Sequence, residues 1–292
     1  MYEINFLKNS MSALYESMTF PRFQYILENI ESEKYVMAFT ASRDGQPVGL
    51  ILAEVRKQDH SAELLSLFVE TSHRSQGVAT QLVCHLEKEL KVRGCKEIDL
   101  NYMTGNQANL ALERVLQKCY WTEPELKMIA CKGRISDNGV QMPWVTKHNY
   151  FQGSYSLFPW REITQEEKRA IEQQRQYIPE DLFPLRYEED MEPLNSLGLR
   201  YQGEVVGWLI SHRIAPDTIR YTCNFIRQDL QKIGRNLGLM AEAIKLQFEA
   251  KIPYIIWTTP IHHRAMVEFT KKRISPYLIY LREIKESHKL IA

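Results

Sequence analysis

Apolar and polar positions along the first 132 residues alternate in a pattern that predicts β-strands separated by helices. Runs with the length and composition of strands occur at 2–7, 35–42, 48–55, 64–69, 97–103 and 126–131. Asp44-Gly45 lies between the second and third runs and predicts a hairpin. Helical periodicity covers 11–30, where Pro21 is expected to break the helix in two. The last run, 126–131, is expected to close this unit as a strand.

Two further segments, one on either side of the strand at 97–103, predict amphipathic helices. In the first, apolar residues recur at i, i+3, i+4, i+7 and i+11, at Ala79, Leu82, Val83, Leu86 and Leu90. Gly94 follows this helix as a C-terminal cap. The second helix, 106–118, is expected to bury Ala108, Ala111, Leu112 and Val115. This order of elements predicts an α/β domain built on a mixed sheet.

The second half of the chain repeats the order of elements seen in the first. Phe225-Ile226 lies 157 residues after Phe68-Val69 (225 − 68 = 157), and residues 201–210 echo residues 43–52. The same offset relates further pairs: Gly77 and Gly234, Leu82 and Leu239, Ala108 and Ala265, and the strands 97–103 and 254–260. Sequence identity between the halves is low, but the shared order and the two aligned glycines predict a duplicated fold.

Between the two halves, residues 133–160 have little periodicity and several glycines and prolines. Aromatic residues in this stretch, Trp144, Tyr150, Phe151, Tyr155 and Phe158, indicate that part of it is ordered. We therefore expect an N-terminal domain at 1–132, a linker at 133–154 and a second domain at 155–292. A chain of 292 residues has the length of two ordinary domains.

The overall charge gives no argument for a polyanionic partner. The chain holds 37 Lys and Arg against 36 Asp and Glu, so its net charge is +1. We expect neither nucleic-acid nor membrane binding. The first residues lack a basic segment followed by an apolar one, and no apolar run approaches the ~20 residues that span a bilayer.

The cysteines and histidines do not form a metal-binding pattern. Five scattered cysteines, with no C-x-x-C pair, are typical of reduced thiols and predict a cytoplasmic protein. His262-His263-Arg264 invites a metal-binding or catalytic interpretation, but no third ligand is evident nearby. A polar helix start is the favoured interpretation, and no metal is predicted.

The segment 68–90 is the most informative part of the sequence. An apolar strand ends at Val69, a polar loop follows, and Gly77 opens an amphipathic helix. Small residues at Gly77 and Ala79 let the backbone approach a ligand closely. The first N–H groups of a helix lack internal partners, and such a helix start binds phosphate well. The pattern therefore predicts a site for a pyrophosphate-bearing cofactor.

Val69-Glu70-Thr71-Ser72-His73-Arg74-Ser75-Gln76-Gly77-Val78-Ala79 resembles the motif V-x-P-x-x-[RQ]-x-x-G-x-[GA] of the GNAT N-acetyltransferase superfamily. Only the proline departs, since Thr71 stands in its place. The flanking strands and helices strengthen the resemblance, which covers 1–132 well and 155–292 at the level of the fold. It implies two tandem GNAT-like acyl-CoA N-acyltransferase domains.

The resemblance implies that acetyl-CoA is the co-substrate and assigns residues to it. The backbone of Leu67, Phe68 and Val69 would hydrogen-bond the pantetheine arm. The pyrophosphate would be held by backbone N–H groups of Arg74, Ser75, Gln76, Gly77, Val78 and Ala79. An Asn that contacts the cofactor in this family is best matched by Asn109, with Asn106 as a competing match. His73, beside Arg74, is either a phosphate contact or a solvated loop residue.

The catalytic groups are less clearly marked. Many family members carry a Tyr that acts as general acid, but at that position this chain has Val115 or Leu116. Tyr102 on the fifth strand therefore becomes the candidate acid. Glu63 on the fourth strand is the candidate base, and Glu70 is a weaker one. Both carboxylates are also consistent with ordinary solvated surface residues.

In the second half the motif erodes to Gln231-Lys-Ile-Gly234-Arg-Asn236. Asn236 replaces the small residue, and Ile233 and Arg235 would crowd the loop. The C-terminal copy is therefore expected to bind CoA weakly or not at all, and to serve structure or substrate selection.

The function predicted from the resemblance is transfer of an acetyl group to a primary amine of a small molecule or a peptide. The alternative is a non-catalytic acyl-CoA-binding or assembly module, which the missing Tyr favours. A third possibility places the cofactor in the second copy. The acceptor and the oligomeric state are not encoded in a recognisable way.

Overall fold

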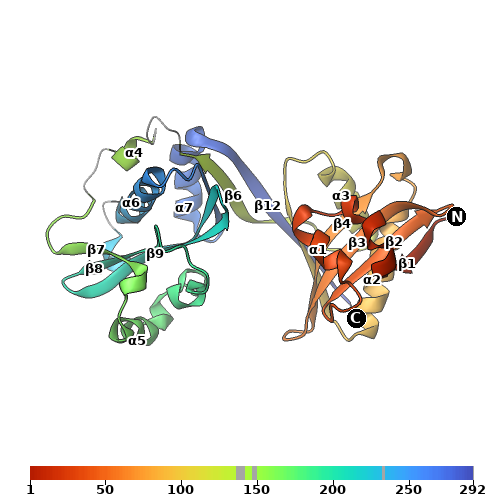
Figure 1. The fold of residues 1–292 in the computed structure, drawn as a ribbon, viewed down its shortest axis with the longest axis horizontal. Coiled ribbons are helices and arrows are strands. Elements are labelled where there is room, and N and C mark those ends of the chain that lie inside the picture. Colours follow the sequence, from red (N-terminus) through yellow and green to blue (C-terminus); the bar gives the residue numbers. More distant parts are fainter. Residues whose placement is uncertain (136–141, 147–149, 232–233, 292) are drawn as a thin grey trace. The chain divides into compact units, whose positions relative to one another are not determined.

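The computed structural model describes residues 1–135, 142–146, 150–231 and 234–291. The chain divides into two compact units, here called unit 1 and unit 2 (Figure 1). Unit 1 comprises Met1–Lys127 and Glu283–Ala292, and unit 2 comprises Met128–Arg282. Each unit is a mixed α/β fold, as the sequence predicts, and each unit's sheet has six strands in equivalent order.

The sheet of unit 1 has the strand order β1-β2-β3-β4-β5-β12. Its strands are β1 (Glu3–Phe6), β2 (Val36–Arg43), β3 (Gln46–Arg56), β4 (Ser61–Val69), β5 (Glu97–Met103) and the end of β12 (Leu278–Leu290). Only β4 and β5 run parallel, and every other neighbouring pair is antiparallel. The first five strands lie where the apolar runs predict them.

Helices cover both faces of this sheet. The helices α2 (Val78–Val92) and α3 (Asn109–Lys118) pack on one face, where Leu82 and Leu86 meet Ile51 and Leu64. The other face is covered by η1 (Asn9–Leu14), η2 (Glu16–Met18) and α1 (Pro21–Glu28). The predicted helix over 11–30 forms only from Pro21 onward, because proline suits the first turn of a helix better than its interior. The residues before Pro21 form 3₁₀ turns.

The sixth strand of each unit differs from the prediction. The predicted strand 126–131 forms as β6 (Glu125–Arg134), but residues 128–134 pair with β11 (Tyr254–Pro260) in unit 2. The strand next to β5 is instead the C-terminal β12, which pairs from Ile284 to Leu290. The prediction that 126–131 closes the first unit is therefore wrong. Apolar alternation records which face of a strand is buried, and it does not record which sheet the strand joins.

Unit 2 has the strand order β7-β8-β9-β10-β11-β6. Its other strands are β7 (Tyr155–Pro159), β8 (Leu197–Tyr201), β9 (Glu204–Ala215) and β10 (Thr218–Ile226). On one face lie α4 (Pro143–Thr146), α6 (Arg235–Glu249), α7 (Arg264–Phe269), a π-helical turn (Thr270–Ile274) and η11 (Ser275–Tyr277). The other face carries η4 (Trp160–Glu162), α5 (Gln165–Gln173), η5 (Arg175–Tyr177), η6 (Glu180–Leu182) and η7 (Pro184–Tyr187).

Equivalent elements of the two units differ by 157 in residue number, and this confirms the predicted duplication. The bounds of α2 and α6, and those of β5 and β11, all differ by this offset. The parallel pair Ser61↔Glu97 in unit 1 corresponds in the same way to Thr218↔Tyr254 in unit 2.

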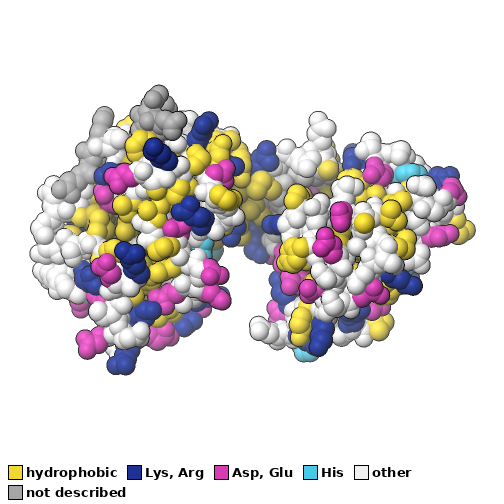
Figure 2. Space-filling model, viewed as in Figure 1, with side chains coloured by type: hydrophobic (Ala, Val, Ile, Leu, Met, Phe, Trp, Pro, Cys, Tyr) yellow, Lys and Arg dark blue, Asp and Glu magenta, His cyan; other side chains and the backbone are white. Residues whose placement is uncertain are grey.

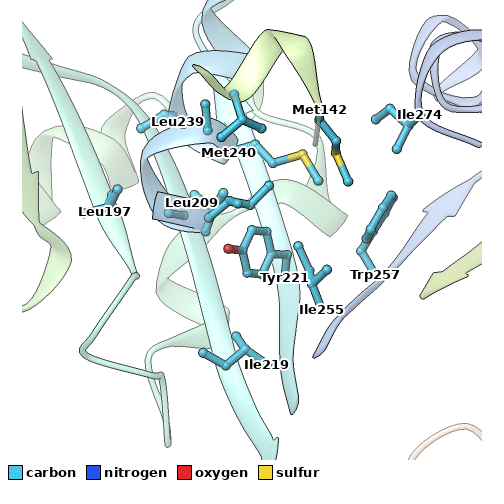
Figure 3. Packing of buried hydrophobic residues seen from close by; sticks show 14 of the residues in the cluster. Met142, Leu197, Leu209, Ile219, Tyr221, Leu239, Met240, Ile255, Trp257 and Ile274 are labelled. Atoms are coloured by element: carbon cyan, nitrogen blue, oxygen red, sulfur yellow. The ribbon is translucent and has the colours of Figure 1, made fainter. Parts of the chain in front are cut away.

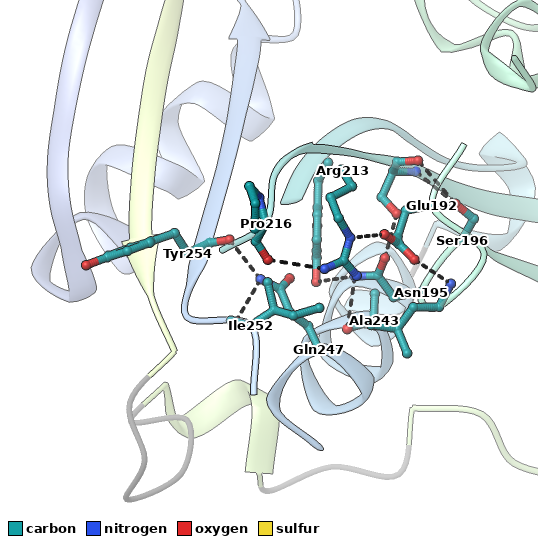
Figure 4. A network of polar contacts seen from close by, with 12 residues as sticks. Glu192, Asn195, Ser196, Arg213, Pro216, Ala243, Gln247, Ile252 and Tyr254 are labelled. Atoms are coloured by element: carbon teal, nitrogen blue, oxygen red, sulfur yellow. Dashed lines mark hydrogen bonds and ion pairs between the residues drawn. The ribbon is translucent and has the colours of Figure 1, made fainter. Parts of the chain in front are cut away.

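The core of unit 2 includes part of the segment that joins the copies. Met142 and Val145 are buried, and Met142 points toward Met240, Trp257 and Ile274 (Figure 3). A separate polar network lies beside this core, where Arg213 donates to Glu192 and the amide of Asn195 donates to Tyr221 and Ala243 (Figure 4).

Basic and acidic side chains are interspersed on the face of both units shown in Figure 2, as the balanced charge suggests. Within the described ranges, none of the helices has the length and apolar character needed to cross a bilayer.

Candidate functional site

The parallel strands β4 and β5 separate partway along their length. They pair at three positions, from Ser61↔Glu97 to Glu63↔Asp99, although β4 continues to Val69 and β5 to Met103. A bulge in β4 at Leu65 marks the start of the separation, because the β3–β4 register shifts there. Beyond it, Leu67, Phe68 and Val69 still pair with β3. Of their backbone groups that do not bond to β3, the Val69 carbonyl accepts from Arg74, and the others are open to a ligand.

The loop after β4 turns the chain into α2 through two left-handed residues. Ser75 has φ 60° and Gly77 has φ 83°, and Gly77 is the residue that precedes the helix. No side chain caps α2, so the N–H groups of its first turn, including those of Val78 and Ala79, are free to hold an anion. Because the Val78 side chain is buried, that residue can offer only its backbone.

The side chains of this loop hold the loop itself in shape. Arg74 donates from Nε to the carbonyl of Val69 at 2.9 Å, which ties the loop to the strand end. Gln76 donates to the Ser72 carbonyl and accepts from the hydroxyl of Tyr2. The Tyr2 hydroxyl also lies 3.0 Å from Nδ1 of His73. His73 is thus packed against Tyr2, which neither sequence interpretation of His73 foresaw.

The two asparagines near the start of α3 have different structural partners. Asn109, the first residue of α3, donates from its side-chain amide to the carbonyl of Met103 at 3.0 Å. Asn106 accepts the backbone N–H of Ala108. Asn109 therefore fastens the helix to the open end of β5, and its side-chain oxygen remains available there.

Glu63 lies on the face of the sheet opposite α2. Its neighbours Ala62 and Leu64 point into the α2 core, so alternation directs Glu63 to the α1 face. Arg56 bridges Glu63, at 3.6 Å, and Asp99 on β5. Burial raises the pKa of the Asp99 carboxyl above its ordinary value, and Arg56 offsets this only in part.

Asn101 follows Asp99 on the same face of β5, beyond the last position at which β4 and β5 pair. Its side-chain oxygen is buried and has no hydrogen-bond partner among the described residues. Asp99 and Asn101 were missed by the sequence analysis. The signal was present, since they are the polar positions of an alternating strand whose apolar positions are Ile98 and Leu100.

Tyr102 points to the other face and joins a polar cluster. Its hydroxyl donates to Oε1 of Glu113 on α3 at 2.5 Å, and Nζ of Lys285 on β12 donates to the same oxygen at 3.0 Å. Burial, together with the Glu113 carboxylate, raises the pKa of Tyr102. The bonds from Tyr102 and Lys285 lower the pKa of Glu113. Tyr102 therefore keeps its proton tightly, which makes it a weak proton donor.

Unit 2 reproduces the backbone of this site. The strands β10 and β11 pair only from Thr218↔Tyr254 to Arg220↔Ile256, and Gly234, with φ 69°, precedes α6. Gln231 donates from Nε2 to the carbonyl of Ile226 at 2.8 Å. This bond is the counterpart of the one between Arg74 and Val69.

The approach to the helix start differs in unit 2. A Cβ on Gly238, in the first turns of α6, would lie 2.5 Å from Cβ of Tyr150 and 2.8 Å from the ring of Phe151. At the equivalent position in unit 1, Gln81 is exposed. Tyr150 and Phe151 thus pack closely over the start of α6. Ile233, which was expected to crowd this loop, lies outside the described residues.

Comparison with known proteins was made at the level of family and of structure. Residues 4–118 match the family described as Acetyltransferase (GNAT) family. This match includes β1 except for its first residue, β2 to β5, and the loop from Val69 to Ala79. No match was found among the curated proteins compared.

Solved structures of similar fold span the whole chain. A tandem GNAT protein from the clavulanic acid biosynthesis pathway has a TM-score of 0.66 at 10% identity, covering 100% of this chain and 99% of that one. A GCN5-related N-acetyltransferase from Sphaerobacter thermophilus has a TM-score of 0.61 at 12% identity, covering 99% and 96%. At these identities the likeness establishes the fold, which is the tandem architecture.

Proposed function

We propose that unit 1, whose residues 4–118 match the Acetyltransferase (GNAT) family, transfers an acetyl group from acetyl-CoA to a primary amine of a small molecule or a peptide. The observation that carries the proposal is the opening between β4 and β5, which leads to the uncapped start of α2. The acyl-CoA supplies the thioester. The protein supplies the binding and orientation.

The residues of unit 1 fit such a cofactor. The open backbone of Leu67, Phe68 and Val69 would pair with the pantetheine arm. The N–H groups from Arg74 to Ala79 would hold the pyrophosphate, and Asn109 would add a polar contact. We assign the cofactor to unit 1 because the equivalent helix start in unit 2 is covered by Tyr150 and Phe151.

The α1 face would receive the acceptor amine. Glu63, as the candidate base, would take a proton from the amine through a water molecule, at a gain of roughly 10²–10⁴-fold. Asn101 would accept a hydrogen bond from the amine with its unpartnered oxygen. A backbone N–H near Phe68 or Val69 would polarise the thioester carbonyl. Tyr102 is retained as the candidate acid, although its hydrogen bond to Glu113 weakens that role.

Isothermal titration of the full chain with acetyl-CoA tests the first step, and one site per chain is expected. Release of free CoA thiol in the presence of a panel of primary amines tests the second. If no acetyl-CoA or CoA binds, the proposal fails. Tight binding without turnover for any amine would favour the alternative, a non-catalytic acyl-CoA-binding module.

The candidate base needs its own test. Replacing Glu63 by Gln should lower kcat about 100-fold or more, with acetyl-CoA binding unchanged. The matched control is Glu70→Gln, which should leave both quantities near the wild-type values.

We also propose a cytoplasmic location, in keeping with cysteines that are all free.

A further inference from the structure

The loop that leads into α3 in unit 1 and into α7 in unit 2 has different side chains in the two units. Unit 1 has Gly105-Asn106 there, and unit 2 has His262-His263 at the offset of 157 residues. In each unit this loop follows the open end of a strand, β5 or β11. The fold itself therefore does not require the two imidazoles of unit 2, because unit 1 forms the same loop with glycine and asparagine.

The structure brings a third possible ligand, Asp181, next to the two histidines. Nε2 of His263 lies 2.7 Å from Oδ2 of Asp181, and Nε2 of His262 lies 3.3 Å from the same oxygen. One possible ligand atom from each of the three residues lies within 4.8 Å of the others. Asp181 belongs to η6, far upstream in the sequence, which explains why spacing alone did not find it.

Both sides of this cluster are held by the fold of unit 2. The backbone N–H of His263 donates to Pro260 at the end of β11, and its carbonyl accepts from Met266 in α7. On the other side, the hydroxyl of Tyr187 donates to the carbonyl of Asp181. The carbonyl of the next residue, Leu182, accepts from the indole of Trp208. The three side chains therefore converge from anchored backbone.

The arginines near Asp181 pair with another carboxylate, so Asp181 pairs with the two histidines. The neighbouring Glu180 is engaged by Arg175 and Arg186. Among the residues that the structure describes, the ion pairs of Asp181 are those with His262 and His263. The side chain of His262 is 63% exposed, so one side of the cluster is open to solvent.

We propose that Asp181, His262 and His263 bind a divalent transition-metal ion of the Zn²⁺ type. Two imidazoles and a carboxylate suit Zn²⁺ or Co²⁺, whereas Mg²⁺ and Ca²⁺ require mostly oxygen ligands. Bonds of about 2.0–2.2 Å in tetrahedral geometry place ligand atoms about 3.3–3.6 Å apart. The His262–Asp181 distance of 3.3 Å is close to this, and the His263–Asp181 distance of 2.7 Å is that of a hydrogen bond and would lengthen on metal binding. Three protein ligands leave the fourth position for water on the exposed side.

The test uses the full-length protein, stripped of metal and titrated with Co²⁺ and then with Zn²⁺. One ion per chain is expected, with the visible absorption of tetrahedral Co²⁺. The double variant His262→Gly and His263→Asn gives unit 2 the residue types that unit 1 has at the equivalent positions, Gly105 and Asn106. It should weaken the binding of either metal ion about 100-fold or more. Asp181→Asn should weaken it at least about tenfold.

Matched controls separate this site from other metal-binding side chains. His60→Asn removes an exposed histidine of unit 1 at a left-handed position that asparagine tolerates, and Cys84→Ser removes the one half-exposed cysteine among the five. Neither should change the affinity. If the double variant does not fold by circular dichroism, the exposed single variant His262→Asn takes its place, with about tenfold weakening expected.

The proposal is overturned if no Zn²⁺ binds at about 100 µM. It is also overturned if binding persists in the histidine variants or disappears in Cys84→Ser. No acyl donor is present in these titrations, so their outcome is independent of the proposed acetyl transfer.

Discussion

Units 1 and 2 share a backbone frame but differ in what lies over it. Each has a parallel strand pair that opens after three positions and a left-handed glycine before a 15-residue helix. In each, a side chain from the loop donates to the carbonyl at the strand end, Arg74 in unit 1 and Gln231 in unit 2. The Gly and Arg or Gln positions of the motif thus build the turn in both units.

The differences lie where a ligand would approach. Ala79 in unit 1 corresponds to Asn236 in unit 2, and the exposed Gln81 corresponds to Gly238, over which Tyr150 packs. The proposed cofactor binding would therefore depend on the small residue and the uncovered helix start. The glycine alone does not distinguish a binding copy from a structural one.

The largest expected effect comes from matched substitutions at the two glycines. Gly77→Glu should abolish detectable acetyl-CoA binding in isothermal titration, because a carboxylate at the helix start repels phosphate and fills the approach. Gly234→Glu imposes the same left-handed strain, of about 1–2 kcal/mol, and should leave the affinity unchanged.

This pair also decides between the copies. If Gly77→Glu retained binding and Gly234→Glu lost it, the cofactor would belong to unit 2. Circular dichroism of both variants shows whether either loss reflects unfolding.

The second comparison concerns the inner faces of the two helices. Leu86 of α2 is fully buried, and its counterpart in α6 is Ala243, which is also fully buried. Leu86→Ala should destabilise unit 1 by about 2–5 kcal/mol through the cavity it leaves. Ala243→Leu should destabilise unit 2 by about 1–3 kcal/mol through overpacking.

Hydrogen exchange of peptides from each unit locates these losses. Faster exchange confined to the substituted unit would mean that the two units unfold separately. Equal acceleration in both would show that the two units unfold together. The strands β6 and β12 would allow this, because each of them runs from one unit into the other.

Much of this comparison could be predicted from the sequence. The apolar pattern predicted β5 with the observed bounds of 97–103, and the offset of 157 residues predicted β11 at 254–260. Both depend on local periodicity, which short segments encode directly.

The rest depends on contacts between distant residues. Lys285 reaches Glu113 only because β12 joins the sheet of unit 1, and Asp181 meets His263 across the fold of unit 2. Neither pairing leaves a signal in local spacing. The prediction that 126–131 completes unit 1 was wrong for the same reason.

A smaller effect separates the two roles of Arg74. Arg74→Gln should keep acetyl-CoA affinity within about threefold, because Gln231 makes the equivalent bond in unit 2. Arg74→Ala removes the bond to the Val69 carbonyl and should weaken binding about fivefold, the equivalent of about 1 kcal/mol. Should titration instead show equal losses in both variants, the guanidinium charge on phosphate would be the main contribution of Arg74.

The smallest expected effect is a pH dependence of opposite sign in the two units. Burial alone would raise the pKa of Glu192 in unit 2, but the bonds from Arg213 and from the N–H of Leu194 outweigh it and hold the pKa below its ordinary value. Its stabilising contribution is present above the ordinary pKa and is lost as the pH falls below it. The pKa of Asp99 in unit 1 is raised by burial, so its contribution increases as the pH falls through the raised value toward the ordinary one.

Hydrogen exchange at a series of pH values from about 3 to 6, corrected for the intrinsic exchange rate, measures this contrast in each unit. Glu192→Gln should flatten the acid-side loss in unit 2, and Asp99→Asn should flatten the opposing trend in unit 1. A substitution that changed the pH dependence of both units equally would contradict the assignment, because each carboxyl contacts only groups of its own unit among the described residues.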